Sequence, residues 1–258
     1  MYPTQWSVLL AIGLFIGLLV CLEAGYRIGA RSSRNNPELA HEGIGVIEAA
    51  VFALLGLLLG FSFAGGTSRL DARRQLIVQE ANAIGTAYLR VDLLPSIDQP
   101  KMRRLFREYL DTRLRIYENL PDREVTQQAI TRVAQLQQEI WADAVTASRT
   151  DPSHDISRLL LPALNEMIDI TTTRMIALRT HLPTLIFILL TMIALLSGLL
   201  AGYAMERRKS RSWLHILLYA AVVAVTIYTV RDLDSPRSGF IHLDAADSAL
   251  RALRNSIR

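Results

Sequence analysis

The chain has 258 residues, of which 51% are hydrophobic, and its formal net charge is +4. Its basic residues stand beside apolar runs or alternate with acids along helices, which argues against a nucleic-acid partner. The single cysteine, Cys21, excludes a disulfide within the chain.

Four apolar runs are each long enough to cross a membrane. A spanning helix needs about 20 mostly apolar residues to cross roughly 30 Å of hydrocarbon. The four runs cover residues 6–26, 44–64, 182–205 and 213–230. We therefore expect an all-α membrane protein with four transmembrane helices, whose first partner is the lipid bilayer. The first run lacks a basic leader and is longer than the apolar region of a signal peptide, so we expect an uncleaved anchor.

The short loops beside the spans predict an orientation. Lys and Arg in short loops favour the cytoplasm, so both short loops should lie inside and the long segment between the second and third spans outside. Basic residues after the second span and in the tail oppose this prediction, but long segments translocate largely regardless of charge. The loop residues are Arg27, Arg31 and Arg34, and then Arg207, Arg208, Lys209 and Arg211.

Residues 67–181 carry repeated helix signals and no alternation long enough for a strand. Leu70, Ile77, Ile84 and Val91 recur every seven residues, which is typical of a coiled-coil seam. This helix follows the second span directly and should stop near Pro95, so span and helix are predicted to be continuous. We expect a helical bundle domain inserted between the second and third spans.

Three further helices complete the predicted domain. One covers about 99–120, one begins near Asp122, and one begins at Ser153 or Asp155 and continues into the third span through a kink at Pro162 or Pro183. In the tail, a short extended piece precedes an amphipathic helix that Asp244 caps. The predicted parts are a first transmembrane pair (1–66), the helical domain (67–181), a second transmembrane pair (182–230), and a C-terminal tail that packs on the helical domain (231–258).

One face of the second span combines an acid with bulky apolar residues at helical spacing. A carboxylate in lipid is costly, so Glu48 should face protein or a water-filled cavity. Such a stripe could line a pore with a hydrophobic constriction, or it could be ordinary packing with Glu48 near the interface. The pore-lining candidates are Glu48, Phe52, Leu55, Leu59 and Phe63.

Small residues four apart recur in three spans, and they let helices pack closely. The second span also carries Ala49, Ala53 and Ala64 in register with its glycines. These patterns favour a tight bundle or an oligomer. The helix-packing candidates are Gly13 with Gly17, Gly56 with Gly60, and Gly198 with Gly202.

Polar residues cluster in the helix that follows the second span. A network between helices explains them well, and a ligand site is the sharper alternative. Gly85, inside a helix at a cost of about 1 kcal/mol, should permit a close contact. The network candidates are Asp71, Arg73, Arg74, Glu80, Asn82, Gly85, Thr86, Arg90 and, in the tail, Arg237.

No catalytic pattern is visible. The five histidines lack metal-ligand spacing, and there is no phosphate loop, dinucleotide fingerprint or nucleophile elbow. We expect no enzyme activity, no cofactor and no metal.

The chain resembles the bestrophin-like family of bacterial membrane proteins. The motifs that carry the resemblance extend from the second span to the tail, and the helix motif is fairly specific to the family. They are Gly60-Phe61-Ser62-Phe63, Asp71-Ala72-Arg73-Arg74, Glu80 to Thr86, Leu93-Leu94-Pro95, and Pro236-Arg237-Ser238-Gly239-Phe240-Ile241.

The resemblance implies a bacterial inner-membrane protein distantly similar to bestrophins, which are pentameric anion channels with a pore lined by the second span. Their neck would fall on Phe52, Leu59 and Phe63 by helix phase alone. Bestrophins hold the inserted domain in the cytoplasm, in conflict with the loop charges. The acidic run that binds calcium in bestrophins is missing from this sequence.

Two functions from different classes follow. The first is an oligomeric ion channel, a pentamer by resemblance, that conducts inorganic ions along its second span. The alternative is a non-conducting scaffold or sensor whose helical domain binds a protein partner or ligand.

Overall fold

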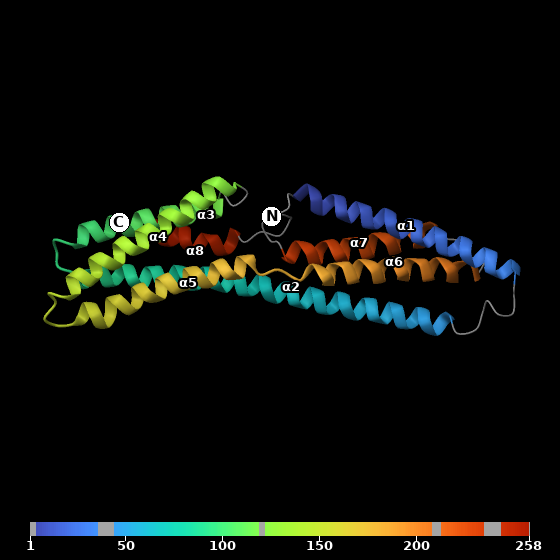
Figure 1. Cartoon of the computed structure of the whole chain (residues 1–258), viewed down its shortest axis with the longest axis horizontal. Coiled ribbons are helices and arrows are strands. Elements are labelled where there is room, and N and C mark those ends of the chain that lie inside the picture. The colour runs from blue at the N-terminus through green and yellow to red at the C-terminus, as the bar shows by residue number, and fades with distance from the viewer. Residues whose placement is uncertain (1–3, 36–43, 119–121, 208–212, 235–243, 258) are drawn as a thin grey trace. The chain divides into compact units, whose positions relative to one another are not determined.

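The computed structural model describes residues 4–35, 44–118, 122–207, 213–234 and 244–257. Within these ranges every regular element is helical, and no strand occurs (Figure 1). The elements are α1 (Thr4–Asn35), α2 (Ile44–Leu89), η2 (Arg90–Leu93), α3 (Gln99–Glu118), α4 (Arg123–Ser148), η3 (Ile156–Leu160), α5 (Leu161–Arg179), α6 (Thr184–Arg207), α7 (Trp213–Asp234) and α8 (Asp244–Ser256).

Four of these helices, α1, α2, α6 and α7, carry stretches that are long enough and apolar enough to cross a membrane. They contain the four predicted runs, so the expectation of an all-helical chain with four long apolar helices is confirmed. The extended piece expected after Ser235 lies outside the described residues.

α2 is much longer than a span because it continues through the predicted coiled-coil seam without a break. It has 46 residues and ends in the short 3-10 helix η2, ahead of Pro95. The predicted continuity of span and helix is therefore confirmed over Ile44–Leu89.

The expected kink between the last domain helix and the third span is wrong in detail. α5 ends at Arg179, α6 begins at Thr184, and the residues between them are not helical. Pro183 has no N–H and disfavours helical backbone at the residue before it, so the helix ends here instead of bending. Pro162 lies in the first turn of α5, where proline is tolerated.

The chain divides into two compact units, which we describe separately. The first unit comprises Met1–Leu70 and His181–His242, and the second comprises Asp71–Thr180 and Leu243–Arg258. In the first unit, α1 packs extensively against α6 and also against α7 (Figure 1). Its core includes Leu18, Leu22, Ala194 and Ala220.

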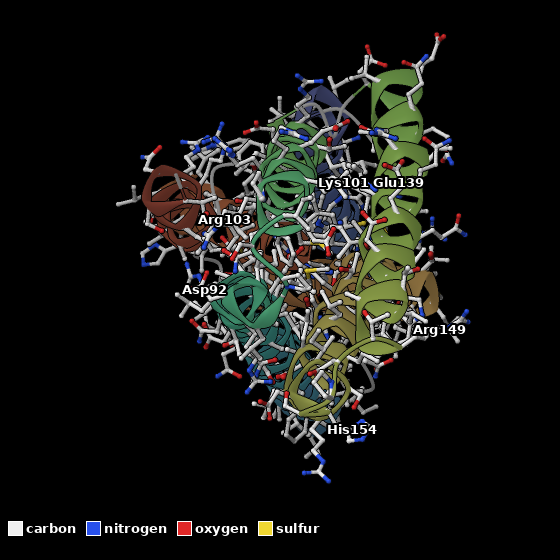
Figure 2. The ribbon with its side chains drawn as sticks, turned by 90° about the vertical axis from the view of Figure 1, so that its left-hand side faces the viewer. Asp92, Lys101, Arg103, Glu139, Arg149 and His154 are labelled. Atoms are coloured by element: carbon white, nitrogen blue, oxygen red, sulfur yellow. The ribbon has the colours of Figure 1, made fainter. Side chains whose placement is uncertain are left out.

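In the second unit, α3 packs against α4 and α8, and α4 packs against α5. The Asp122 side chain begins α4 as predicted, because it accepts hydrogen bonds from the backbone N–H groups of Glu124 and Val125. Apolar side chains at helical spacing form the core of this unit, among them Ile84, Leu110, Leu136, Leu160 and Leu164. His154 lies in the turn before η3 (Figure 2).

Candidate functional site

The apolar stretch of α2 is the least covered of the four candidate spans. Only 11% of it is buried within the chain, against 22% to 39% in the other three. Within 45–64, Leu55 and Ser62 are the buried side chains. A helix this exposed in one chain has a surface free for lipid, another copy or a pore.

The predicted pore-lining stripe turns partly toward its own chain. Leu55 is 4% exposed and belongs to the apolar core of the first unit, and Leu59 packs against that core. The Phe52 ring meets the Tyr219 ring of α7 edge-on, with centroids 5.9 Å apart. Glu48 is half-buried, whereas Phe63 is 45% exposed.

The small residues of α2 lie on a face that its own chain leaves open. Ala49, Ala53 and Ala64 are exposed, and a Cβ added at Gly56 or Gly60 would meet no atom within 4 Å. These residues recur at helical spacing beside Phe63. The open face of α2 therefore includes a small-residue stripe bordered by Phe63, and the large side chains of Leu57 and Phe61 are exposed beside it.

The other predicted glycines lie mainly where α1 meets α6. A Cβ added at Gly202 would lie 2.0 Å from the Leu22 carbonyl oxygen, and one at Gly198 would lie 3.3 Å from Leu18 Cδ2. A Cβ added at Gly17 would lie 3.2 Å from Leu195 Cδ2, whereas a Cβ added at Gly13 would meet no atom within 4 Å.

Gly25, which is not among the predicted packing glycines, lies on the opposite side of the same contact. A Cβ there would lie 2.0 Å from the Leu199 carbonyl oxygen. Gly25 and Gly202 therefore let the α1 and α6 backbones approach too closely for any larger residue.

A charged cluster forms around Asp234, at the end of α7 in the first unit. The Asp234 carboxylate, 4% exposed, accepts hydrogen bonds from Arg69 Nε at 3.0 Å and from the Leu182 backbone N–H at 3.0 Å. His181 Nδ1 lies 3.5 Å from the same carboxylate. Asp234 thus joins the end of α7 to α2 and to the segment that enters α6.

The second unit holds a buried ion-pair triad, defined here as Glu80, Arg113 and Arg174. The Glu80 carboxylate is fully buried and pairs with Arg113 at 2.5 Å through one oxygen and with Arg174 through the other. Both arginine side chains are at most 3% exposed. With two guanidinium groups and one carboxylate, the triad carries a formal net charge of +1.

Tyr109 forms a neutral hydrogen-bond chain in the same unit. Thr171 donates to the Met167 carbonyl, so Tyr109 must donate to Thr171 Oγ1, 3.0 Å away, and Gln137 donates to both hydroxyl oxygens. Burial raises the pKa of Tyr109, although nearby Arg113 acts in the opposite direction. Tyr109 therefore stays a neutral donor.

Of the predicted network residues, Glu80 joins the triad and two arginines bind backbone carbonyls. Arg73, which is buried, donates to the carbonyls of Ala177 and Thr180 at the end of α5. Cations stabilise helix C-termini in this position. Arg90 donates to the Leu159 carbonyl in η3 at 2.6 Å.

The remaining network candidates take other roles. Asp71 and Arg74 form an exposed pair on one helix, and Asn82 and Thr86 are exposed. A Cβ at Gly85 would lie 3.4 Å from Leu253 of α8, so the glycine lies in a close helix contact. Arg237 lies outside the described residues.

Arg113 and Arg174 were missed, although the sequence contains a signal for both. Each follows a run of apolar residues at spacings of three and four, where a charged side chain must point into the core. Arg113 lies on the face of Tyr109 and Ile116, and Arg174 on the face of Leu164 and Met167. A charge at a core position predicts a buried partner.

The triad has the chemistry of a structural element. Both oxygens of its carboxylate are occupied by guanidinium groups, and the three side chains join three helices. Across the described part of the chain, no group of three or more His, Cys, Asp and Glu side chains is placed to hold a metal. Salt bridges on the surface, such as Asp92 with Arg103 (Figure 2), join neighbouring helices.

The family model of the Bestrophin-like domain matches residues 13–247 of the chain. Comparisons with curated proteins and with solved structures gave no match. The matched region includes the open face of α2, the α1–α6 glycine contact, the Asp234 cluster and the triad. The family match and the four helices apolar enough to span a bilayer fit a membrane protein. The chain belongs to the bestrophin-like domain family.

Proposed function

We propose that this protein is a homo-oligomeric ion channel whose second span, in α2, lines the conduction path. The observation that carries the proposal is the open face of α2. That face is apolar and lined by small residues, and its own chain does not cover it.

The structure favours a different lining face from the one that the sequence suggested. Leu55 and Phe52 are engaged by their own chain, so a path along α2 requires the neighbouring side, which that chain leaves open. We assign it to Ala53, Gly56 and Gly60, with Phe63 as the constriction.

Close packing supports assembly through this face. Lipid tails are as apolar as leucine, so helices associate in a bilayer through close contacts between small residues and not through hydrophobic burial. Gly56 and Gly60 would let several copies of α2 converge around an axis. A ring of Phe63 side chains could then close the path by excluding water.

We place the channel in the bacterial inner membrane, in the orientation that the loop charges predict. Basic residues of the two short loops then face the cytoplasm, and both termini and the second unit face outward.

Conduction and lining can be tested together with a cysteine series in planar bilayers. The native Cys21 is first replaced by serine, and Ala53→Cys is compared with Leu55→Cys as the matched control. We expect single-channel currents that a water-soluble thiol reagent blocks in Ala53→Cys and leaves unchanged in Leu55→Cys. Block in Leu55→Cys alone would overturn the lining assignment.

Oligomeric state separates a channel from a scaffold or sensor. Native mass spectrometry should show an oligomer, and Phe63→Ala should alter its currents. A monomer without currents would overturn the channel and support the non-conducting alternative. Gly56→Leu should disrupt the oligomer while leaving the chain folded, because nothing within the chain lies near that position.

A further inference from the structure

A groove of about 620 Å³ lies in the first unit between α1, the end of α6 and the start of α7. Its size falls within the range of roughly 300–1,000 Å³ that is usual for small-molecule sites. It is separate from the open face of α2, which contributes none of its lining residues. Binding in this groove is therefore independent of conduction along α2.

The groove is apolar at one end and polar at the other. Ile16, Leu19 and Val20 line it inside the apolar run of α1. One to two turns later, Glu23, Tyr26 and Arg27 line it where that run ends. The molecule that fits this gradient has a hydrocarbon part and a charged head.

The polar end lies where a bilayer has its headgroups. Tyr26 lies at the end of the first apolar run, and Trp213 begins the fourth. Tyrosine and tryptophan are enriched at the boundary between hydrocarbon and water, because their rings are apolar and their tips are polar. The two aromatic residues mark the depth of the groove in the membrane.

The charge at this end favours an anion. Arg27 donates from Nε to Glu23 at 2.8 Å, and its side chain is 71% exposed. Arg31 and Arg34 follow on α1, and Glu23 is the only acid in that helix. The end of α1 therefore carries an excess of positive charge, which attracts anionic lipid headgroups.

We propose that this groove binds one anionic phospholipid. Its phosphate pairs with Arg27, its polar glycerol region lies beside Tyr26 and Trp213, and one acyl chain follows Ile16 and Val20 toward the bilayer centre. Arginine suits this role because its guanidinium forms charge-assisted hydrogen bonds to phosphate oxygens.

Trp213 provides a local reporter, because it lines the groove and can be quenched by brominated acyl chains. Trp6 and Trp141 are replaced by phenylalanine, and the full-length protein is reconstituted into vesicles of brominated phosphatidylglycerol or brominated phosphatidylcholine mixed with unlabelled lipid. We expect phosphatidylglycerol to quench Trp213 at a lower mole fraction than phosphatidylcholine.

Arg27→Gln should remove most of the preference for phosphatidylglycerol. We expect the ratio of the two lipids' apparent affinities to fall by about fivefold, the effect expected for one basic residue near an anionic surface. Arg31→Gln is the matched control, because Arg31 carries the same charge one turn away and does not line the groove. It should leave most of the preference intact. Native mass spectrometry checks that both variants keep the parent's oligomeric state.

Two results would overturn the proposal. Equal quenching by both lipids, unchanged in Arg27→Gln, would show ordinary boundary lipid instead of a site. An absence of quenching by either lipid would show that a second copy of the chain covers the groove. Neither result bears on currents through α2, so the lipid site and the channel fail separately.

Discussion

The Glu80 carboxylate and the Arg113 guanidinium form an ion pair at 2.5 Å in which neither side chain is more than 1% exposed. They come from α2 and α3, and Arg174 of α5 completes the triad from a third helix. Burying a charge costs several kcal/mol, which only good geometry and a full set of partners offset. The triad therefore fixes which faces of the three helices meet.

Glu80→Gln should strongly destabilise the protein, because it leaves two guanidinium groups buried without a carboxylate. Breaking a buried pair in this way costs about 3–5 kcal/mol. The measurement is thermal unfolding of the full-length protein in detergent, with Asp71→Asn as the exposed control, which should change stability by less than about 1 kcal/mol.

A triple variant, Glu80→Leu with Arg113→Met and Arg174→Met, should recover most of the loss, since an apolar replacement of a buried triad is often neutral or stabilising. A Glu80→Gln variant as stable as the parent would show that the triad contributes nothing to folding.

The turn between α4 and η3 should weaken in acid. Asp151 accepts hydrogen bonds from the backbone N–H groups of Ile156 and Ser153 and from the Ser153 hydroxyl. These hydrogen bonds lower the pKa of Asp151 below its ordinary value, and the bond from the Ile156 backbone has the largest effect. Its stabilising effect is therefore complete above the unfolded-state pKa of about 3.9 and is lost as pH falls through the lower folded-state pKa.

Denaturant unfolding between pH 6 and pH 2.5 measures this contribution. Asp151→Asn should be less stable than the parent at pH 6, and the difference should shrink at the acid end. Asp155→Asn, an exposed acid in the same turn, serves as the control. A constant difference between Asp151→Asn and the parent across this range would contradict the assignment.

Gly25→Ala and Gly202→Ala should each destabilise the first unit. A methyl group at either position would lie 2.0 Å from a carbonyl oxygen of the facing helix, so α1 and α6 must separate. We expect the free energy of unfolding to fall by about 1–3 kcal/mol, the usual cost of overpacking. Gly13→Ala is the control, because nothing lies within 4 Å of it. Thermal unfolding in detergent should rank Gly13→Ala with the parent and the other two below it.

The orientation can be read from one exposed residue of the second unit. In a Cys21→Ser background, Ser96→Cys should react with a membrane-impermeant maleimide in intact cells, because the loop charges place this unit outside. Labelling only after permeabilisation would instead place the second unit in the cytoplasm and reverse the orientation adopted above.

Hydrophobic patterning alone determined the four apolar helices and the continuous α2, because length and apolarity decide whether a helix can cross a bilayer. The start of a helix near Asp122 followed equally from the local sequence, and the Asp122 side chain caps it by accepting from N–H groups two and three residues away.

Only the tertiary structure decided which face of α2 is open. Helix periodicity groups Phe52, Leu55 and Leu59 on one side, but it cannot tell whether that side meets a pore or α7. Small residues gave no better guidance: Gly13 and Gly202 look alike in sequence, yet one faces open space and the other a backbone carbonyl. The partners of Glu80 likewise depend on how α3 and α5 pack, because Arg113 and Arg174 lie 33 and 94 residues away. Periodicity fixes direction around one helix axis, whereas contacts between distant segments depend on the packing of the whole chain.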